Sequence, residues 1–315
     1  MSSLWKRLSR WMSIKSELDA EDDLDSEGEE LARRLEGLSG YRVLRALDPD
    51  VGIERLGPPQ VGQRMAAVID SETTGLDVEA DRMVELAIQR FLFEPDGQIA
   101  AIERVRAWRE DPGRPMPERL VRLTGLRDVD LRDRRFDEKM IVQLLDSADL
   151  IIAHNAAFDR PFVERRFPQL TPGAWACSLD QLDWLDLGYD GRSLGHLLLQ
   201  SGHFFEGHRA ALDVVALTTL LSTGLSDGRT ILSHLLANCE RDSVRVEAVQ
   251  APYNSKDLLK SRSYRWDSAA RHWWREIDPD AVEAEKDWLD QNVYLGRGSP
   301  KMRKITARNR FRAKV

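Results

Sequence analysis

Residues 66–76 read Ala-Ala-Val-Ile-Asp-Ser-Glu-Thr-Thr-Gly-Leu, and the fold prediction starts from them. The run begins with apolar residues that include Val68 and Ile69, a pattern typical of a buried strand. Asp70 and Glu72 follow at spacing i, i+2, so they share one face of that strand. Neighbouring carboxylates repel each other unless a cation lies between them. The stretch predicts a hard-metal site at the end of a central strand, although Asp-x-Glu also occurs at solvated strand ends.

Two further segments place acidic side chains at the ends of predicted elements. His154-Asn-Ala-Ala-Phe-Asp159 follows the apolar run at 150–153 and opens a helix, and His208 and Asp213 stand at the start of another. Five residues are a little over one helical turn, so His208 and Asp213 can reach one pocket. Singly, each has an ordinary explanation, such as a carboxylate stabilised by a helix N-terminus. Jointly, in this order and each at an element end, coincidence is improbable.

The residue types indicate phosphoryl chemistry. Four carboxylates can converge on two cations, namely Asp70, Glu72, Asp159 and Asp213. Two hard cations roughly 3.5–4 Å apart can activate a water and steady the leaving oxygen in an attack on phosphorus. Ligation by oxygen alone favours Mg²⁺ or Mn²⁺ over zinc. A histidine whose pKa is near neutral can take the proton from that water.

These segments resemble the motifs of the DEDDh exonucleases, a family that includes the bacterial DNA polymerase III epsilon proofreading subunit, RNase T and oligoribonuclease. Asp70-Ser-Glu72-Thr-Thr-Gly is similar to the first motif, His154-Asn-x-x-Phe-Asp159 to the second, and His208-x4-Asp213 to the histidine form of the third. Leu123-Thr-Gly125 is similar to a loop of epsilon-type members. The resemblance covers about 66–222 and implies an RNase H-like fold and 3′→5′ hydrolysis of nucleic acid to nucleoside monophosphates.

The resemblance also implies a role for each site residue. Asp70, Glu72 and Asp213 would hold a first metal, Asp70 and Asp159 a second, and His208 would be the general base. The substrate-binding set would be Thr73, Thr74, Gly75, Leu76, His154, Asn155 and Phe158, with Leu76 wedged against the terminal base. Ser71 departs from the larger residue that relatives often carry. It points away from the metal face of the strand, so we expect it to matter little.

Composition limits the class of protein. The chain has 315 residues, 42% of them hydrophobic, and a net charge of −7, enough for two domains or one large one. Residues 17–36 are strongly acidic, whereas residues 297–315 carry eight basic side chains and no acidic one. Cys177 and Cys239 lie far apart, which argues against a disulfide scaffold or structural zinc. No apolar run approaches ~18 residues, so we expect no membrane span and a cytoplasmic protein.

The pattern along the chain predicts an α/β protein with an RNase H-like mixed sheet flanked by helices, an N-terminal helical extension and a small α+β C-terminal module. The expected divisions are a helical and acidic extension (1–63), the exonuclease domain (64–225), a helical connector (226–250), the module (251–296) and a basic tail (297–315). The expected helices are 1–15, 30–47, 136–147, 155–167, 194–200, 209–221, 229–249, 256–260 and 278–289. The expected strands are 66–71, 83–94, 99–108, 150–153, 264–266 and 272–276, and residues 109–135 are expected to form a long surface loop.

Aromatic and basic residues alternate in the C-terminal module, as they would in a platform for a nucleic-acid strand. The basic ones are Lys256, Lys260, Arg262, Arg265, Arg271 and Arg275. The alternative is that the tryptophans are the core of a small unit, which needs large apolar groups. We favour that alternative for at least half of Trp266, Trp273, Trp274 and Trp288. The basic tail is more often a solvated end, although a nuclease could use it to hold phosphates.

The leading functional hypothesis is a metal-dependent 3′→5′ exonuclease with two Mg²⁺ (or Mn²⁺) that acts on single-stranded or frayed 3′ ends of DNA in proofreading or repair. Trimming of RNA 3′ ends is an alternative, because discrimination depends on the 2′-hydroxyl. A second alternative is a non-catalytic nucleic-acid-binding or scaffold subunit of a polymerase assembly, so a DNA polymerase or sliding clamp is a candidate partner. Residues 181–185 faintly resemble a clamp-binding peptide, but their place inside the domain favours a structural role.

Overall fold

The computed structural model describes residues 27–50, 52–268 and 270–312, which divide into two units. The smaller unit contains the described residues up to Ala46 together with Gly202–Phe204. Residues 27–36 are helical, and β1 (Arg45–Ala46) pairs in parallel with β8 (His203–Phe204). The helix expected over 30–47 therefore ends early, where Gly37 and Gly40 interrupt the pattern. The helix expected over 1–15 lies outside the described residues.

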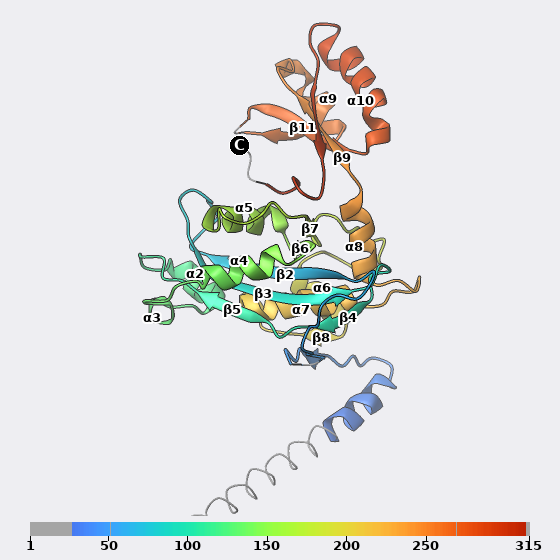
Figure 1. Ribbon diagram of the computed structural model, residues 1–315. Helices are drawn as coiled ribbons and strands as arrows, with labels where there is room; N and C mark the ends of the chain where they lie inside the picture. Colours follow the sequence, from blue (N-terminus) through green and yellow to red (C-terminus); the bar gives the residue numbers. More distant parts are fainter. Residues whose placement is uncertain (1–26, 51, 269, 313–315) are drawn as a thin grey trace, which may run out of the picture. The chain divides into compact units, whose positions relative to one another are not determined.

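The larger unit is built on a mixed sheet (Figure 1). The strand order is β4-β3-β2-β6-β7, with β3 antiparallel to β2, and with β2, β6 and β7 parallel. This arrangement confirms the predicted α/β class and RNase H-like sheet. In place of the single strand expected over 99–108 there are two short strands, and each of them pairs with a different part of the long β3. The bounds are β2 (Arg64–Thr73), β3 (Met83–Phe93), β4 (Ile99–Ile102), β5 (Arg106–Arg109), β6 (Leu150–Ala153) and β7 (Trp175–Cys177).

Helices cover both faces of the sheet, and β2 supplies side chains to each face in turn. Ala66 and Val68 pack in the core formed with α6 (Leu194–Gln200), α7 (Ala210–Ser222) and α8 (Ile231–Glu240). Ala67 and Ile69 pack in the core formed with α4 (Glu138–Asp146) and α5 (Ala156–Arg166). When this alternation is followed along β2 as far as residue 72, it places Asp70 and Glu72 on the α7 side of the sheet and Ser71 on the α5 side.

Residues 109–135 are not the plain surface loop that we expected. They contain α2 (Glu118–Thr124) and α3 (Asp128–Leu131), and α2 ends at Gly125 in the left-handed region with φ of 72°. Leu126 and Leu131 are buried with Met116 against Val84 of β3. The sparse apolar residues of this charged stretch thus form a small core of their own, which gives the short helices something to pack on.

The C-terminal module is a four-stranded antiparallel sheet in the order β10-β11-β9-β12. Its core joins these strands to α9 (Lys256–Ser261) and α10 (Val282–Leu289), and includes Trp273 and Trp288 but not the exposed Trp266. The helix expected over 229–249 ends at Glu240, and alternating Val244, Val246 and Ala248 form a strand instead. The strands are β9 (Ser243–Ala248), β10 (Arg265–Asp267), β11 (His272–Ile277) and β12 (Lys301–Ile305), and single turns occur at η1 (Tyr253–Ser255), η2 (Pro279–Ala281) and η3 (Asp290–Tyr294).

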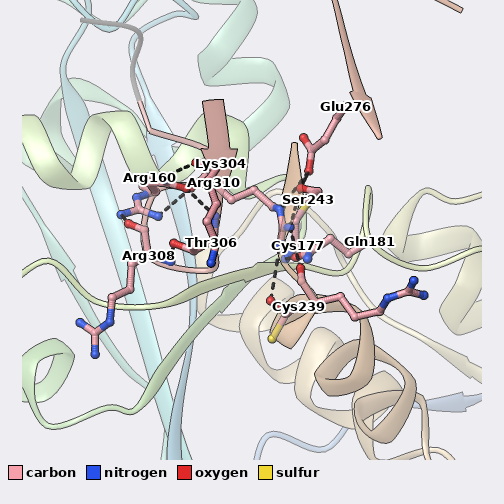
Figure 2. A network of polar contacts seen from close by, with 12 residues as sticks. Arg160, Cys177, Gln181, Cys239, Ser243, Glu276, Lys304, Thr306, Arg308 and Arg310 are labelled. Atoms are coloured by element: carbon pink, nitrogen blue, oxygen red, sulfur yellow. Dashed lines mark hydrogen bonds and ion pairs between the residues drawn. The ribbon is translucent and has the colours of Figure 1, made fainter. Parts of the chain in front are cut away.

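The described part of the basic tail has an ordered fold, although most of its basic side chains are exposed. Residues 301–305 are the edge strand β12, and residues 306–312, here called the C-terminal strap, return to the sheet that contains β2, β6 and β7. The fully buried Arg160 donates hydrogen bonds to the carbonyl oxygens of Arg308 (2.7 Å) and Arg310 (2.6 Å), and the Trp175 N–H donates to the Ala307 carbonyl (2.8 Å) (Figure 2). The strap therefore covers both α5 and the edge strand β7.

Two smaller expectations concern the surface. Within the described part of the chain, no helix is both long and apolar enough to cross a membrane. In the segment that resembles a clamp-binding peptide, Leu182 and Trp184 are buried in the core on the α7 side. That segment is therefore structural, as its position in the domain suggested.

Candidate active site

Three carboxylates meet at the end of β2. Asp70 and Glu72 reach from the strand, and Asp213 comes from the first turn of α7, with one oxygen of each within 4.8 Å of the others. The Arg209 N–H donates to Asp213 at 2.9 Å and fixes that side chain at the start of the helix. All three are partly buried, and among the described residues none forms an ion pair within 4.0 Å. This set offers only oxygen ligands, as a hard divalent cation prefers.

Asp159 approaches the same strand end from the opposite face of the sheet. It lies in the first turn of α5, and its carboxylate accepts hydrogen bonds from the Ser71 N–H (3.1 Å) and the Ser71 hydroxyl (2.7 Å). Its side chain is buried, and its charge acts directly on Asp70. The structure thus brings together all four carboxylates that the sequence predicted, with Asp159 beside the tighter group of three.

The site concentrates carboxyl groups that find no ion-pair partner within 4.0 Å among the described residues. Burial, and then the charges of Asp159 and Asp213, hold the pKa of Asp70 well above its usual range. Burial and Asp213 raise the pKa of Glu72 to about 8. Burial raises the pKa of Asp159 to about 7 against the lowering effect of the Ser71 hydrogen bonds, and burial also raises the pKa of Asp213. A bound cation would reverse these shifts, which is the electrostatic signature of a metal site.

His208 stands at an exposed bend directly before α7. Its backbone has a positive φ of 65°, and its N–H and its charge both lower the pKa of Asp213. The imidazole is therefore beside the carboxylate group and open to solvent, where a proton acceptor is needed. Its role as general base stays a prediction.

The loop after β2 is held in one conformation. The Thr74 hydroxyl accepts from Arg114 (2.6 Å) and donates to Asp81 (3.1 Å). A Cβ at residue 75 would lie 2.3 Å from an Asp81 oxygen, so any other residue there would displace the Asp81 side chain that holds the loop. Leu76 follows with 84% of its surface exposed. The predicted substrate-contacting loop is thus preformed with an apolar side chain at its tip, and Asp81 and Arg114 are supporting residues that the sequence reasoning missed.

The second motif has a more structural character than we expected. Both ring nitrogens of His154 are engaged, with the Ser178 hydroxyl at 2.8 Å and the Arg192 carbonyl at 2.9 Å, and burial lowers the pKa of His154 to about 4. Phe158 packs on Phe162 at 5.1 Å between ring centroids. Asn155 is exposed at the start of α5 with φ of 96°. Substrate contact by these residues stays a prediction, and Asn155 is the most accessible of them.

Two further residues support the site. Ser71, which we expected to matter little, orients Asp159 through two hydrogen bonds, so that expectation is wrong. Glu85 is buried opposite Glu72 in the sheet, where it accepts from Arg109 Nε (2.8 Å) and from the Ala210 N–H (3.2 Å) at the start of α7. A lone carboxylate inside an otherwise apolar strand was the available signal for Glu85. The sequence held no signal for Ser71, because its partner is 88 residues away.

Comparison with known proteins assigns this domain. Residues 67–221 match the RNase T family model, described as an exonuclease. The DNA polymerase III PolC-type protein of Listeria welshimeri is 32% identical over 111 residues, 33% of this chain and 7% of that protein. The protein of the same name in Bacillus subtilis strain 168 is 30% identical over 169 residues, 51% of this chain and 11% of that protein. The chain thus matches only a small part of these relatives.

A solved structure of Exonuclease X in complex with 5′ overhanging duplex DNA is 21% identical, with 53% of this chain and 99% of that chain covered and a TM-score of 0.37. At that score the fold assignment depends on the strand order and on the family match. The matched residues include the strand and the two helices that carry the four carboxylates, and the third motif has its histidine form. The domain at 67–221 thus matches an exonuclease family model, and its three motifs resemble those of the DEDDh-type 3′→5′ exonucleases.

Proposed function

We propose that this protein is a metal-dependent exonuclease that hydrolyses phosphodiester bonds from the 3′ end of DNA and releases nucleoside monophosphates. The observation that carries the proposal is the meeting of Asp70, Glu72, Asp159 and Asp213 at one strand end, where the described residues supply no ion-pair partner within 4.0 Å. We assign the catalytic domain to 64–225, as the sequence suggested. The strands of the structure support a C-terminal module that extends from 243 to 305.

The donor set fits two divalent cations. We propose that Asp70, Glu72 and Asp213 hold one, that Asp70 and Asp159 hold the other, and that both are Mg²⁺ or Mn²⁺, since every donor is a carboxylate oxygen. When bound, such cations activate a water and stabilise the leaving oxygen in an attack on phosphorus. Ser71 keeps Asp159 in place for this task, and Glu85 holds the start of α7 beneath Asp213.

Other side chains would orient the strand end and move the proton. His208, at the exposed bend before α7, is the residue that we propose takes a proton from the attacking water. We propose that Leu76 lies against the terminal base, and its exposure on a loop that Asp81 and Arg114 support is in favour of this role. We propose that the terminal nucleotide is also contacted by Thr73, Thr74, Gly75 and Asn155.

The direct test is release of labelled nucleotide from the 3′ end of an oligonucleotide. We expect release with Mg²⁺ or Mn²⁺, none with chelator, and none from Asp70→Asn. Single-stranded DNA, a duplex with a mispaired 3′ end and short RNA are compared side by side. A preference for RNA would mean that RNA, and not DNA, is the substrate. If no nucleotide is released from any of the three substrates, the chain is a non-catalytic binding subunit.

We also propose that the protein acts together with a DNA polymerase or its sliding clamp. The support is that the Listeria and Bacillus relatives are DNA polymerase III chains of PolC type, in which the matched region is a small part. Size-exclusion chromatography with purified polymerase and clamp subunits tests this association. Elution of the chain apart from both would remove the partner and leave the nuclease proposal intact.

A further inference from the structure

The C-terminal sheet has two unlike faces. Val246, Ile277 and Trp273 point toward the core that includes α9 and α10. Because side chains alternate along a strand, their neighbours point to the opposite face. On that face the register places Arg265 beside Trp274 and Arg245 beside Arg303. We call this the basic face, and it takes most of its cations from β9 and β12, which the sequence analysis had assigned to the connector and the tail.

Charge on the basic face is layered. Asp267 and Glu247 lie close to the sheet, where both form ion pairs with the nearly buried Arg245, at 3.1 Å and 2.9 Å respectively. Above them, Arg265, Lys301 and Arg303 are exposed. Among the described residues, Arg265 has no carboxylate partner within 4.0 Å, and its guanidinium carbon lies 5.9 Å from the centroid of the Trp274 ring. The exposed Glu276 of the same face is paired with Arg310 (3.4 Å). The surface that meets solvent therefore carries more positive than negative side chains, although the chain as a whole has a net charge of −7.

A cleft of about 880 Å³ lies between the basic face and α5. Seven arginines and four carboxylates line it, and Arg241, Arg303 and Arg312 contribute side chains that are 67%, 58% and 41% exposed. Partners outside the lining engage residues of both signs, Asp242 with Lys304 (2.6 Å) and Asp180 with Arg192 (3.6 Å), but also Arg312 with Glu164 (3.2 Å) and Arg275 with Glu285 (3.5 Å). Within the lining itself the arginines outnumber the carboxylates. The cleft therefore has a positive excess that suits a polyanion.

The two walls of the cleft are joined by the polar network of Figure 2. The nearly buried Arg310 guanidinium donates to the carbonyl oxygens of Cys239 (3.3 Å) and Arg241 (3.0 Å), and to the Ser243 hydroxyl (3.0 Å). From the α5 side, Arg160 donates to the backbone of the same strap. The cleft is thus held open by buried hydrogen bonds, and a ligand would find it already formed.

We propose that the basic face and its cleft bind the sugar-phosphate backbone of a single nucleic-acid strand, at a distance from the bond that is cut. The inference rests on the proposed exonuclease function, which supplies the strand. Arginine and lysine contacts to phosphate dominate such binding and carry no sequence preference. The site is separate from the carboxylates, because Asp159 is turned toward Ser71 whereas Ala157 and Pro161 of the same helix line the cleft. It therefore contributes affinity for long strands and leaves the chemical step unchanged.

The test measures binding and hydrolysis separately in the full chain. Fluorescence anisotropy with a labelled 25-residue oligothymidylate, in chelator and across a salt series, reports binding without cleavage. For Arg265→Ala/Arg303→Ala we expect affinity to fall by about 10-fold or more and the salt slope to shrink by about 1.4, since each phosphate contact on a single strand accounts for ~0.7. In hydrolysis with Mg²⁺, KM for the long strand should rise while kcat, and both constants for a trinucleotide, stay unchanged.

The matched control is Lys260→Ala/Lys286→Ala, which removes the same charge from the helices behind the sheet. This variant should bind like the unmodified chain. Equal weakening by both variants, or no weakening by the first, would overturn the proposal, and circular dichroism excludes misfolding as the reason. Strand binding in chelator without hydrolysis in Mg²⁺ would support this site and reject the proposed function, so the two failures are distinguishable.

Discussion

Two buried acidic groups of this molecule are treated in opposite ways. In the C-terminal module, Glu285 is 3% exposed, accepts a hydrogen bond from Tyr264 (2.8 Å), and pairs with Arg262 (3.0 Å) and Arg275 (3.5 Å). In the exonuclease domain, Asp70 has four other carboxylates as its charged neighbours, Asp159, Asp213, Glu72 and Glu85. A buried charge without a partner is costly, so the fold neutralises it where the role is structural. The charge that it leaves in place marks where a cation is to bind.

The largest effects should come from neutralising each of these two carboxylates in a separate variant. Asp70→Asn should lower turnover by on the order of 10³-fold or more, because a metal ligand contributes several kcal/mol to the transition state. In chelator its thermal midpoint should stay level or rise, because the change removes mutual repulsion. Glu285→Gln should do the reverse and lower stability by about 3–5 kcal/mol, since two arginines lose their partner. Equal losses of stability in the two variants would refute the comparison.

A second test separates the role of the carboxylates from that of the proposed proton acceptor within the nuclease site. His208→Ala should lower kcat by about 10²–10⁴-fold, because it removes the proposed proton acceptor and none of the metal ligands. The Mn²⁺ concentration for half-maximal activity should change little. His234→Ala is the matched control, because His234 pairs with Asp227 on another surface. Near-normal turnover of His208→Ala would show that another group accepts the proton.

A smaller effect should follow from removing one of the hydrogen bonds that hold the Asp159 carboxylate in place. Ser71→Ala removes the 2.7 Å hydrogen bond to Asp159 and keeps the one from the backbone N–H. A hydrogen bond to a charged group contributes about 1.5–3 kcal/mol, so the half-saturating Mn²⁺ concentration should rise by roughly 10-fold or more. Ser255→Ala removes a buried hydroxyl from the C-terminal module and should leave metal dependence unchanged. The same Mn²⁺ titration for both variants would show that Ser71 has no part in positioning.

The smallest effect should be a shift of thermal stability with pH. In the metal-free fold the pKa of Glu72 is about 8 and that of Asp159 about 7, against about 4 for both in the unfolded chain. The folded state therefore binds more protons than the unfolded state between about pH 4 and 8, and stability falls as pH rises through this range. In chelator we expect the midpoint to drop by a few degrees between pH 5 and 8, and Mg²⁺ to reduce that drop. A midpoint that rises with pH would contradict the unneutralised cluster.

The sequence pattern located the four carboxylates of the site but not the residues that support them, and the reason is physical. Asp70, Glu72, Asp159 and Asp213 stand beside short-range signals, a strand end or a helix start, which local pattern reveals. Ser71 and Arg160 owe their roles to partners 88 and 150 residues away, and no local pattern records such a contact.

The misassigned strands have a related cause. Residues 243–248 alternate Val244, Val246 and Ala248 directly after a helix, and residues 301–305 show only two apolar side chains among basic ones. Edge and half-buried strands expose every second residue, so their composition approaches that of a solvated segment. Their pairing is decided by the sheet that receives them.

The strap that returns to Arg160 also sets an order of events during synthesis. Arg160 leaves the ribosome 150 residues ahead of the carbonyl of Arg310 that it will bond. At ~5–20 residues per second, that interval is on the order of 10 s. Throughout it, the Arg160 guanidinium has Glu164 but lacks its two carbonyl acceptors in the strap, and the edge strand β7 lacks the strap that covers it. The domain therefore matures after its own residues have been translated, and a ribosome that stalls before residue 306 would release a polypeptide open to proteases at α5.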